Sequence, residues 1–180
     1  LKNNIKNYQK LCTEYKKELW PMIKTHKSME IVGMQIKEGA TGVLCGTLDE
    51  AEACCEKGIQ KIMYAYPVAS EENIRRIIEM TKKTDFIIRL DSLEAAIKIN
   101  KIAEAENVII SYTIIVDNGL HRFGLSLKNL LTFAEELKKM KNLKLRGISS
   151  HPGHVYSSTC EEDIHKYCLL YTSDAADELL

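Results

Sequence analysis

A lysine with polar neighbours follows a short apolar segment near the beginning of the chain. The run PMIKTHKS, residues 21–28, places Lys24 directly after Ile23, with His26 and Lys27 close behind. A lysine at the partly desolvated end of a strand can attack a carbonyl carbon and form a Schiff base. His26 could handle protons near that amine, or it could be an ordinary histidine hydrogen-bonded in a loop. The plainer interpretation of Lys24 is a surface lysine that closes an edge strand.

Other polar residues follow three later apolar runs. They are Asp91 after Leu90; Asp117, Asn118, His121 and Arg122 after Val116; and His151 and His154 after Ser150. In a parallel α/β protein the strands end on the face that holds the active site, so these residues are candidates for chemistry. Polar residues follow strands in every such protein, however, and Asp91 and Asp117 are expected to be helix caps or loop anchors.

The elements that would position these residues alternate regularly between strand and helix. An amphipathic helix pattern covers residues 1–19. Strands are predicted in the segment before Lys24 and at residues 42–46, 61–66, 85–90, 108–116 and 143–149. Helices are predicted at residues 28–38, 48–57, 70–83, 92–106 and 126–141, with Ser70 and Ser92 as capping residues. This alternation predicts a parallel α/β sheet.

Two parallel architectures compete, the closed (β/α)₈ barrel of the TIM type and the doubly wound open sheet. No GxGxxG sequence follows any predicted strand, so the dinucleotide-binding form of the open sheet has no support. We therefore favour the barrel. Six predicted strands cannot close an eight-stranded barrel, so we expect a barrel truncated to about six strands, with the last two βα units lying beyond this sequence.

Composition excludes several classes of partner. Lysine plus arginine and aspartate plus glutamate each number 25, and no basic block suggests nucleic acid or an anionic membrane. No apolar run approaches 18 residues, the usual length of a membrane span. No metal-ligand spacing occurs among the six cysteines, Cys12, Cys45, Cys54, Cys55, Cys160 and Cys168. We expect reduced thiols and a cytoplasmic location.

The end of the sequence has an unusual composition. Residues 168–178, CLLYTSDAADE, resemble the translation of a sequencing adapter. We therefore expect residues 168–180 to be a non-native tail, and residues 1–167 to be a partial barrel domain.

Four collinear segments carry a family resemblance. PMIKTHKS at 21–28, GVLCGTLDEAE at 42–52, VDNGLHRFG at 116–124 and RGISSHPGHVY at 146–156 resemble the alanine racemase N-terminal barrel domain of the fold-type III pyridoxal-phosphate enzymes. The D-threonine aldolase and D-serine dehydratase group is the most similar. Members of that group often carry RPH before the lysine, where this chain has Trp20, Pro21 and Met22. That departure leaves the exact reaction open.

The resemblance implies roles for five residues. Lys24 would bind pyridoxal 5'-phosphate as a Schiff base, and Arg122 would lie near the phenolic oxygen of the cofactor, although a salt bridge closing its loop is the alternative. His151 would back the cofactor ring, and His154 matches a Gly-His pair of the dehydratase group. His26 would handle protons behind Lys24. No metal ligand is expected in this chain.

The implied function of the parent protein is a lyase that acts on a β-hydroxy D-amino acid, by retro-aldol cleavage or by loss of water. A divalent metal would be held by a C-terminal domain outside this sequence, and the full-length protein would be a homodimer. The chain by itself would be inactive. The alternatives are an amino-acid racemase, in which Lys24 moves the α-proton, and a non-catalytic carrier of the cofactor.

Overall fold

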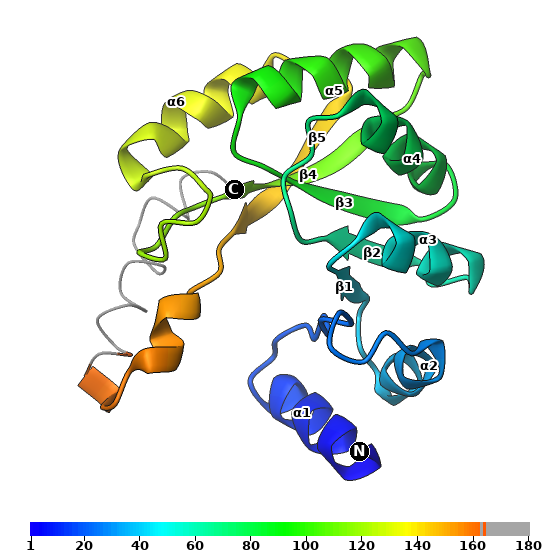
Figure 1. Ribbon diagram of the computed structural model, residues 1–180, viewed down its shortest axis with the longest axis vertical. Helices are drawn as coiled ribbons and strands as arrows, with labels where there is room; N and C mark the ends of the chain where they lie inside the picture. Colours follow the sequence, from blue (N-terminus) through cyan, green and yellow to red (C-terminus); the bar gives the residue numbers. More distant parts are fainter. Residues whose placement is uncertain (163, 165–180) are drawn as a thin grey trace. The chain divides into compact units, whose positions relative to one another are not determined.

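The computed structural model describes residues 1–162 and residue 164, which fall into two compact units. Unit 1 comprises residues 1–66 and 70–88, and unit 2 comprises residues 67–69 and the described residues from 89 onward. In both units strand and helix alternate along the chain (Figure 1). The expectation of a non-native tail at residues 168–180 lies outside the described residues.

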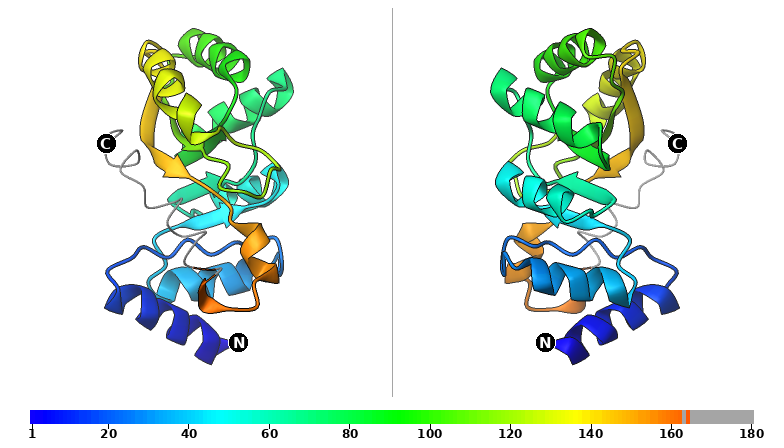
Figure 2. Two further views of the ribbon diagram at one scale, coloured as in Figure 1. Left: turned by 90° about the vertical axis from the view of Figure 1, so that its left-hand side faces the viewer. Right: turned by 90° about the vertical axis from the view of Figure 1, so that its right-hand side faces the viewer.

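Unit 1 holds the lysine segment and the first strands of the sheet. Its elements are α1 (Lys2–Glu14), α2 (Met29–Glu38), β1 (Val43–Cys45), α3 (Leu48–Glu56), β2 (Lys61–Tyr64), α4 (Glu71–Thr81) and most of β3 (Asp85–Leu90). The strands are parallel, with Cys45 opposite Tyr64 and Met63 opposite Ile87. α1 lies beside α2 (Figure 2).

Unit 2 begins at the last two residues of β3. It contains α5 (Leu93–Ala105), β4 (Ile110–Ile115), α6 (Leu127–Lys138), β5 (Leu143–Ser149) and a short 3₁₀ helix, η1 (Gly153–Ser157). β4 and β5 are parallel, and their register shifts between Tyr112 and Thr113. α5 and α6 lie side by side (Figure 2). The strands follow the sequence order β1-β2-β3-β4-β5, which confirms the predicted parallel α/β sheet.

Serine or threonine residues fix where the helices begin. Their hydroxyl groups accept a hydrogen bond from a backbone N–H of the first turn and satisfy a donor that has no partner within the helix. The acceptors are Ser28 for α2, Thr47 for α3, Ser70 for α4 and Ser92 for α5. The two predicted caps, Ser70 and Ser92, are thereby confirmed. These caps set where the loops before α2, α3, α4 and α5 end.

Each unit buries its own apolar side chains between strands and helices. In unit 1, Ile23 and Ile62 are fully buried with Ile74 of α4. In unit 2, Tyr112 and Ile114 of β4 are buried, as are residues of α5 and α6. β3 and β4 alternate little between polar and apolar residues because nearly all of their side chains are buried, as in a strand covered on both faces.

Two predicted elements differ from the structure. The N-terminal helix ends at Glu14, not near residue 19, and Lys16 has a left-handed φ of 53° that cannot continue it. No residue of α1 is buried, and Tyr8, Leu11 and Tyr15 on its predicted apolar face are at least half exposed. The segment before Lys24, expected to be a strand, makes only an isolated parallel bridge from Met22 to Leu44.

A membrane-spanning helix was not expected from the sequence. Within the described residues, no helix combines the length and the apolar character that crossing a bilayer requires.

Candidate functional site

Lys24 lies at a sharp turn that follows a buried residue. The Ile23 backbone N–H donates to the Leu44 carbonyl at 3.0 Å, which docks this segment against β1. Ile23 is 0% exposed, and its carbonyl accepts the N–H groups of both His26 and Lys27. The chain therefore reverses immediately after Ile23, and Lys24 is left exposed.

The stem of Lys24 passes closely over Gly46, the residue that follows β1. A Cβ atom placed on Gly46 would lie 3.0 Å from Lys24 Cβ and 3.3 Å from Lys24 Cδ. Carbon atoms in ordinary contact lie about 3.5–4.0 Å apart, so the lysine stem uses space that only a glycine leaves open. This close approach fixes the direction of the Lys24 side chain relative to β1.

A buried carboxylate lies beneath the same glycine. Glu50, in the first turn of α3, is 8% exposed, and its Oε2 accepts the Gly46 N–H at 2.8 Å. Its second oxygen, Oε1, lies 3.9 Å from Lys27 Nζ and has no hydrogen-bond partner among the described residues. No role for Glu50 was expected from the sequence. The available signal was the Thr47-x-x-Glu50 pattern, which is typical of a capping box.

His26 lies behind Lys24 in the same turn. Its Nδ1 accepts the Ser28 backbone N–H at 3.1 Å, so in the neutral ring the proton lies on Nε2. Nε2 is buried and has no hydrogen-bond partner in the part of the chain that the structure describes. The structure thus shows the hydrogen-bonded loop histidine that was one of the two interpretations. A role in proton transfer stays a prediction.

Two buried thiols lie under the lysine segment. Cys45 of β1 and Cys54 of α3 are both 0% exposed, and Cys54 Sγ lies 3.9 Å from Met29 Sδ. The hydrogen bond to Cys54 and burial together raise the pKa of the Cys45 thiol well above its usual range. Among the described residues, no group of three or more His, Cys, Asp or Glu side chains could hold a metal ion.

In unit 2, Asp117 organises the loop that follows β4. Its Oδ1 accepts the backbone N–H groups of Gly119 and His121, both at 3.0 Å, and its Oδ2 lies 2.8 Å from His121 Nδ1. Burial opposes ionisation of Asp117, but these hydrogen bonds and the nearby imidazole outweigh it and lower the pKa of Asp117. The prediction that Asp117 anchors a loop is confirmed.

Gly124 closes this loop at a position that excludes other residues. Its φ is +109°, and a Cβ atom there would lie 2.7 Å from the Asp117 backbone nitrogen. The Gly124 N–H donates to Asp91 Oδ2 at 2.9 Å, so Asp91 is also the loop anchor that was predicted. Arg122, between these anchors, is exposed, and its Cζ lies 4.4 Å from the centroid of the Phe123 ring. Its predicted role toward a cofactor stays a prediction.

His151 and His154 lie in the segment after β5, and both are half-buried. A Cβ atom on Gly119 would lie 3.4 Å from the His154 ring, so His154 packs against the Asp117 loop. The His151 ring makes an edge-to-face contact with Tyr156 at 6.2 Å between centroids. The structure therefore brings His154 to the loop that carries Arg122. Lys24 and His26 belong to unit 1.

A buried arginine in unit 2 was not singled out from the sequence. Arg89 of β3 is 5% exposed, and its Nε donates to Ser149 Oγ, which also accepts the Thr113 hydroxyl, both at 2.9 Å. A signal was available, because a charged residue between apolar neighbours, as Arg89 is in the strand DFIIRL, is unusual.

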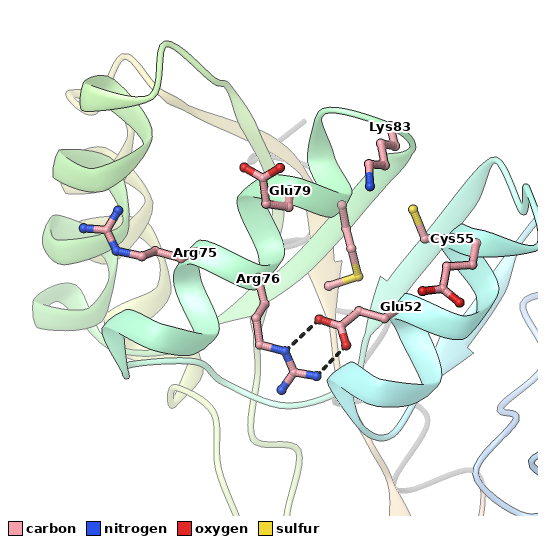
Figure 3. A pocket seen from close by; sticks show the side chains of 8 residues that line it. Glu52, Cys55, Arg75, Arg76, Glu79 and Lys83 are labelled. Carbon is pink, nitrogen blue, oxygen red and sulfur yellow. Dashed lines mark hydrogen bonds and ion pairs between the residues drawn. The ribbon is translucent and has the colours of Figure 1, made fainter.

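A pocket between α3 and α4 contains none of the predicted site residues (Figure 3). Arg76 of α4 extends along its edge and forms a two-pronged ion pair with Glu52 of α3, with both nitrogen–oxygen distances at 2.7 Å (Figure 3). Asp49 also binds the Arg76 guanidinium. This charge cluster holds two helices together in unit 1.

Comparisons with known proteins agree on the fold. The family model for the alanine racemase N-terminal domain matches residues 1–175. Alanine racemase of Methanococcus maripaludis is 28% identical over 156 residues, covering 84% of this chain and 40% of that protein. The D-threo-3-hydroxyaspartate dehydratase of Delftia sp. is 26% identical over 159 residues, covering 87% of this chain and 42% of that protein.

A solved structure gives the same result. The crystal structure of D-threonine aldolase from Filomicrobium marinum aligns with a TM-score of 0.88 at 17% identity, covering 99% of this chain and 47% of that chain. This chain thus spans less than half the length of each relative. The match to the family model nevertheless covers nearly all of the sequence. The chain belongs to the alanine racemase N-terminal domain family, the barrel domain of the fold-type III pyridoxal-phosphate enzymes.

Proposed function

We propose that this chain is the cofactor-binding barrel of an enzyme that acts on D-amino acids, with Lys24 as the residue that holds the cofactor covalently. The family implies pyridoxal phosphate as that cofactor. The observation that carries the proposal is the placement of Lys24, an exposed residue directly after the buried Ile23 whose stem lies over Gly46.

The residues around Lys24 fit such a group. The glycine at position 46 leaves space that a side chain would fill, and Lys24 is exposed. Pyridoxal phosphate, when bound, supplies an electron sink for bond cleavage at the α-carbon of an amino acid. The chain supplies orientation: Ile23 and Gly46 direct the lysine, and His26 offers the proton of Nε2 as a donor. Arg122, His151 and His154 are the further candidates for cofactor contacts.

Chemical trapping tests the assignment of Lys24. The chain would be incubated with pyridoxal phosphate, reduced with borohydride, digested and examined by mass spectrometry. We expect the reduced adduct on the peptide that contains Lys24, and its loss in Lys24→Ala. Lys27→Arg is the matched control, since it alters a neighbouring lysine with an exposed side chain and should keep the adduct. An adduct that survives in Lys24→Ala would contradict the proposal.

For the reaction, we propose cleavage or dehydration of a β-hydroxy D-amino acid by the parent enzyme. The similarity to the Delftia dehydratase supports this choice. The parent enzyme would be incubated with D-threonine and with D-threo-3-hydroxyaspartate, with and without a divalent metal. Glycine with acetaldehyde from D-threonine would indicate an aldolase, and a 2-oxo acid with ammonia would indicate a dehydratase. No turnover of either substrate would contradict the lyase proposal.

An amino-acid racemase is the second candidate, because the Methanococcus relative is an alanine racemase. Exchange of the α-proton of alanine with solvent deuterium, followed by chiral analysis, separates it from the lyase. Conversion of L-alanine to its mirror image without a requirement for metal would favour the racemase.

We also propose a cytoplasmic location and a homodimeric parent enzyme. All five cysteines in the described part of the chain are free thiols, which suits a reducing compartment. Sedimentation of the parent enzyme tests the dimer, and a monomeric mass at micromolar concentration would contradict it.

A further inference from the structure

The buried carboxylate of Glu50 is more than a helix cap. A charged side chain that is 8% exposed costs free energy unless hydrogen bonds or an opposite charge compensate it. Oε2 is compensated by the Gly46 N–H, but Oε1 has no hydrogen-bond partner among the described residues. The cation beside Oε1 is Lys27 at 3.9 Å, and its side chain is 67% exposed, so solvent screens much of the attraction.

The position of Glu50 places it next to the Lys24 stem. A Cβ atom on Gly46 would lie 3.5 Å from Glu50 Oε2 and 3.3 Å from Lys24 Cδ. The carboxylate and the lysine stem therefore meet around one glycine, the residue whose N–H the carboxylate holds. Any displacement of Glu50 would move Gly46, and with it the surface on which the stem of Lys24 rests.

We propose that Glu50 is a positioning residue for Lys24. It fixes Gly46 beneath the lysine stem through Oε2 and thereby sets the direction in which that stem leaves the turn. The meaning of this inference for catalysis rests on the proposed function of Lys24. The contacts themselves do not depend on the cofactor, so they can be tested in the chain without it.

The test measures the reactivity of individual lysines. The full chain would be treated with limiting formaldehyde and a mild borohydride, and methylation of Lys24 would be compared with that of the exposed Lys98 by peptide mass spectrometry. Glu50→Ala removes the acceptor of the Gly46 N–H, so the Lys24 stem loses its fixed support, and the methylation rate of Lys24 relative to Lys98 should rise by about threefold or more. Glu50→Gln keeps an oxygen that can accept the Gly46 N–H, so it should keep the ratio of the unsubstituted chain.

A matched variant separates positioning from helix capping. Thr47→Ala removes the other side-chain bond at the same helix end, in which Thr47 Oγ1 accepts the Glu50 N–H at 3.1 Å. It should lower the melting temperature but leave the Lys24-to-Lys98 ratio within about 1.5-fold of the unsubstituted chain, because Glu50 can still accept the Gly46 N–H. An unchanged ratio in Glu50→Ala, or an equal rise in Glu50→Gln or Thr47→Ala, would overturn the inference.

Trapping with pyridoxal phosphate completes the test. If Glu50 holds Gly46 and the lysine stem in place, Glu50→Ala should weaken covalent retention of the cofactor at Lys24 by about tenfold, whereas Glu50→Gln and Thr47→Ala should not. Equal retention in Glu50→Ala and the unsubstituted chain would also overturn the inference. Absence of any adduct at Lys24 in the unsubstituted chain would contradict the proposed function instead, and the methylation ratio would still decide the role of Glu50.

Discussion

The guanidinium of Arg89 donates its Nε hydrogen to the hydroxyl of Ser149, sixty residues later in the chain, at 2.9 Å. Thr113 of β4 donates to the same oxygen, and Ser149 Oγ also lies 3.4 Å from the Ile114 carbonyl. One small hydroxyl at the end of β5 therefore links side chains of three strands. A buried charge is tolerated here because it takes part in a polar network.

Removal of that hydroxyl should destabilise the protein. Ser149→Ala leaves buried donors on Arg89 and Thr113 without this acceptor, which should lower the free energy of unfolding by about 1–3 kcal/mol. Urea unfolding followed by circular dichroism measures the loss. Ser150→Ala is the matched control: Ser150 Oγ is buried without a hydrogen-bond partner among the described residues, so its removal should be neutral or slightly stabilising. Equal losses in both variants would contradict the role of Ser149.

Gly124 should not tolerate a side chain. At φ +109°, a Cβ atom would lie 2.7 Å from the Asp117 nitrogen, and Gly124→Ala should cost about 1–3 kcal/mol of unfolding free energy. Gly33→Ala provides the comparison, since Gly33 lies inside α2 and a Cβ atom there would meet no other atom within 4 Å, and it should gain about 0.5–1 kcal/mol. Thermal melts of both variants should therefore shift in opposite directions.

The Arg76 cluster makes stability depend on pH. The hydrogen bond from Arg76 lowers the pKa of Glu52, so the pair stabilises the fold above the ordinary glutamate pKa and loses this effect as pH falls through the lowered value. Both side chains are about one-third exposed, so Arg76→Ala should cost less than about 1 kcal/mol at pH 7. The difference should shrink only as pH falls below the ordinary glutamate pKa and through the lowered pKa of Glu52, as melts across an acidic pH series would show.

Arg75→Ala is the control for that series. Arg75 pairs with Glu71 on the same helix, but both side chains are 57% exposed. We expect its loss to cost a few tenths of a kcal/mol at most, about the value of an exposed pair one helical turn apart. A larger effect in Arg75→Ala than in Arg76→Ala would show that the α3–α4 pair is not the stabilising contact.

Tyr112 should resist ionisation. It is 1% exposed on β4, and burial raises the pKa of its phenol to about 12. The unfolded chain would ionise this group near pH 10, so folding stability should fall as pH rises from about 10 to 12. Tyr112→Phe removes the group and should flatten that part of the stability curve. An identical alkaline slope in both proteins would show that Tyr112 does not contribute.

Much of the fold could be predicted because apolar runs in the sequence become buried strands, and the capping serines stand where helices begin. β3 and β5 were predicted with their observed bounds, since both are apolar runs between polar turns. The prediction that the segment before Lys24 forms a strand was wrong. Pro21 has no N–H to donate, and the chain turns at Lys24, so only one bridge forms there.

The site was predicted less completely than the fold. Lys24 stands out because its neighbours in sequence form a recognisable segment, whereas Glu50 gains its importance from contacts with Gly46 that sequence alone does not reveal. Arg89 and Ser149 likewise meet only in three dimensions. Sequence patterns therefore say least about charged residues whose hydrogen-bond partners lie on other strands.

The strand order has a consequence for synthesis. β1 pairs with β2, β2 with β3, and β4 with β5, so these strands find their partner in the next βα unit of the chain. Helices that begin at their own serine or threonine need no distant residue to set their start. Pairing strands of consecutive units costs less loop-closure entropy than pairing strands from distant parts of the chain. The barrel can therefore assemble in order as the polypeptide leaves the ribosome, with each unit adding to the one made just before it.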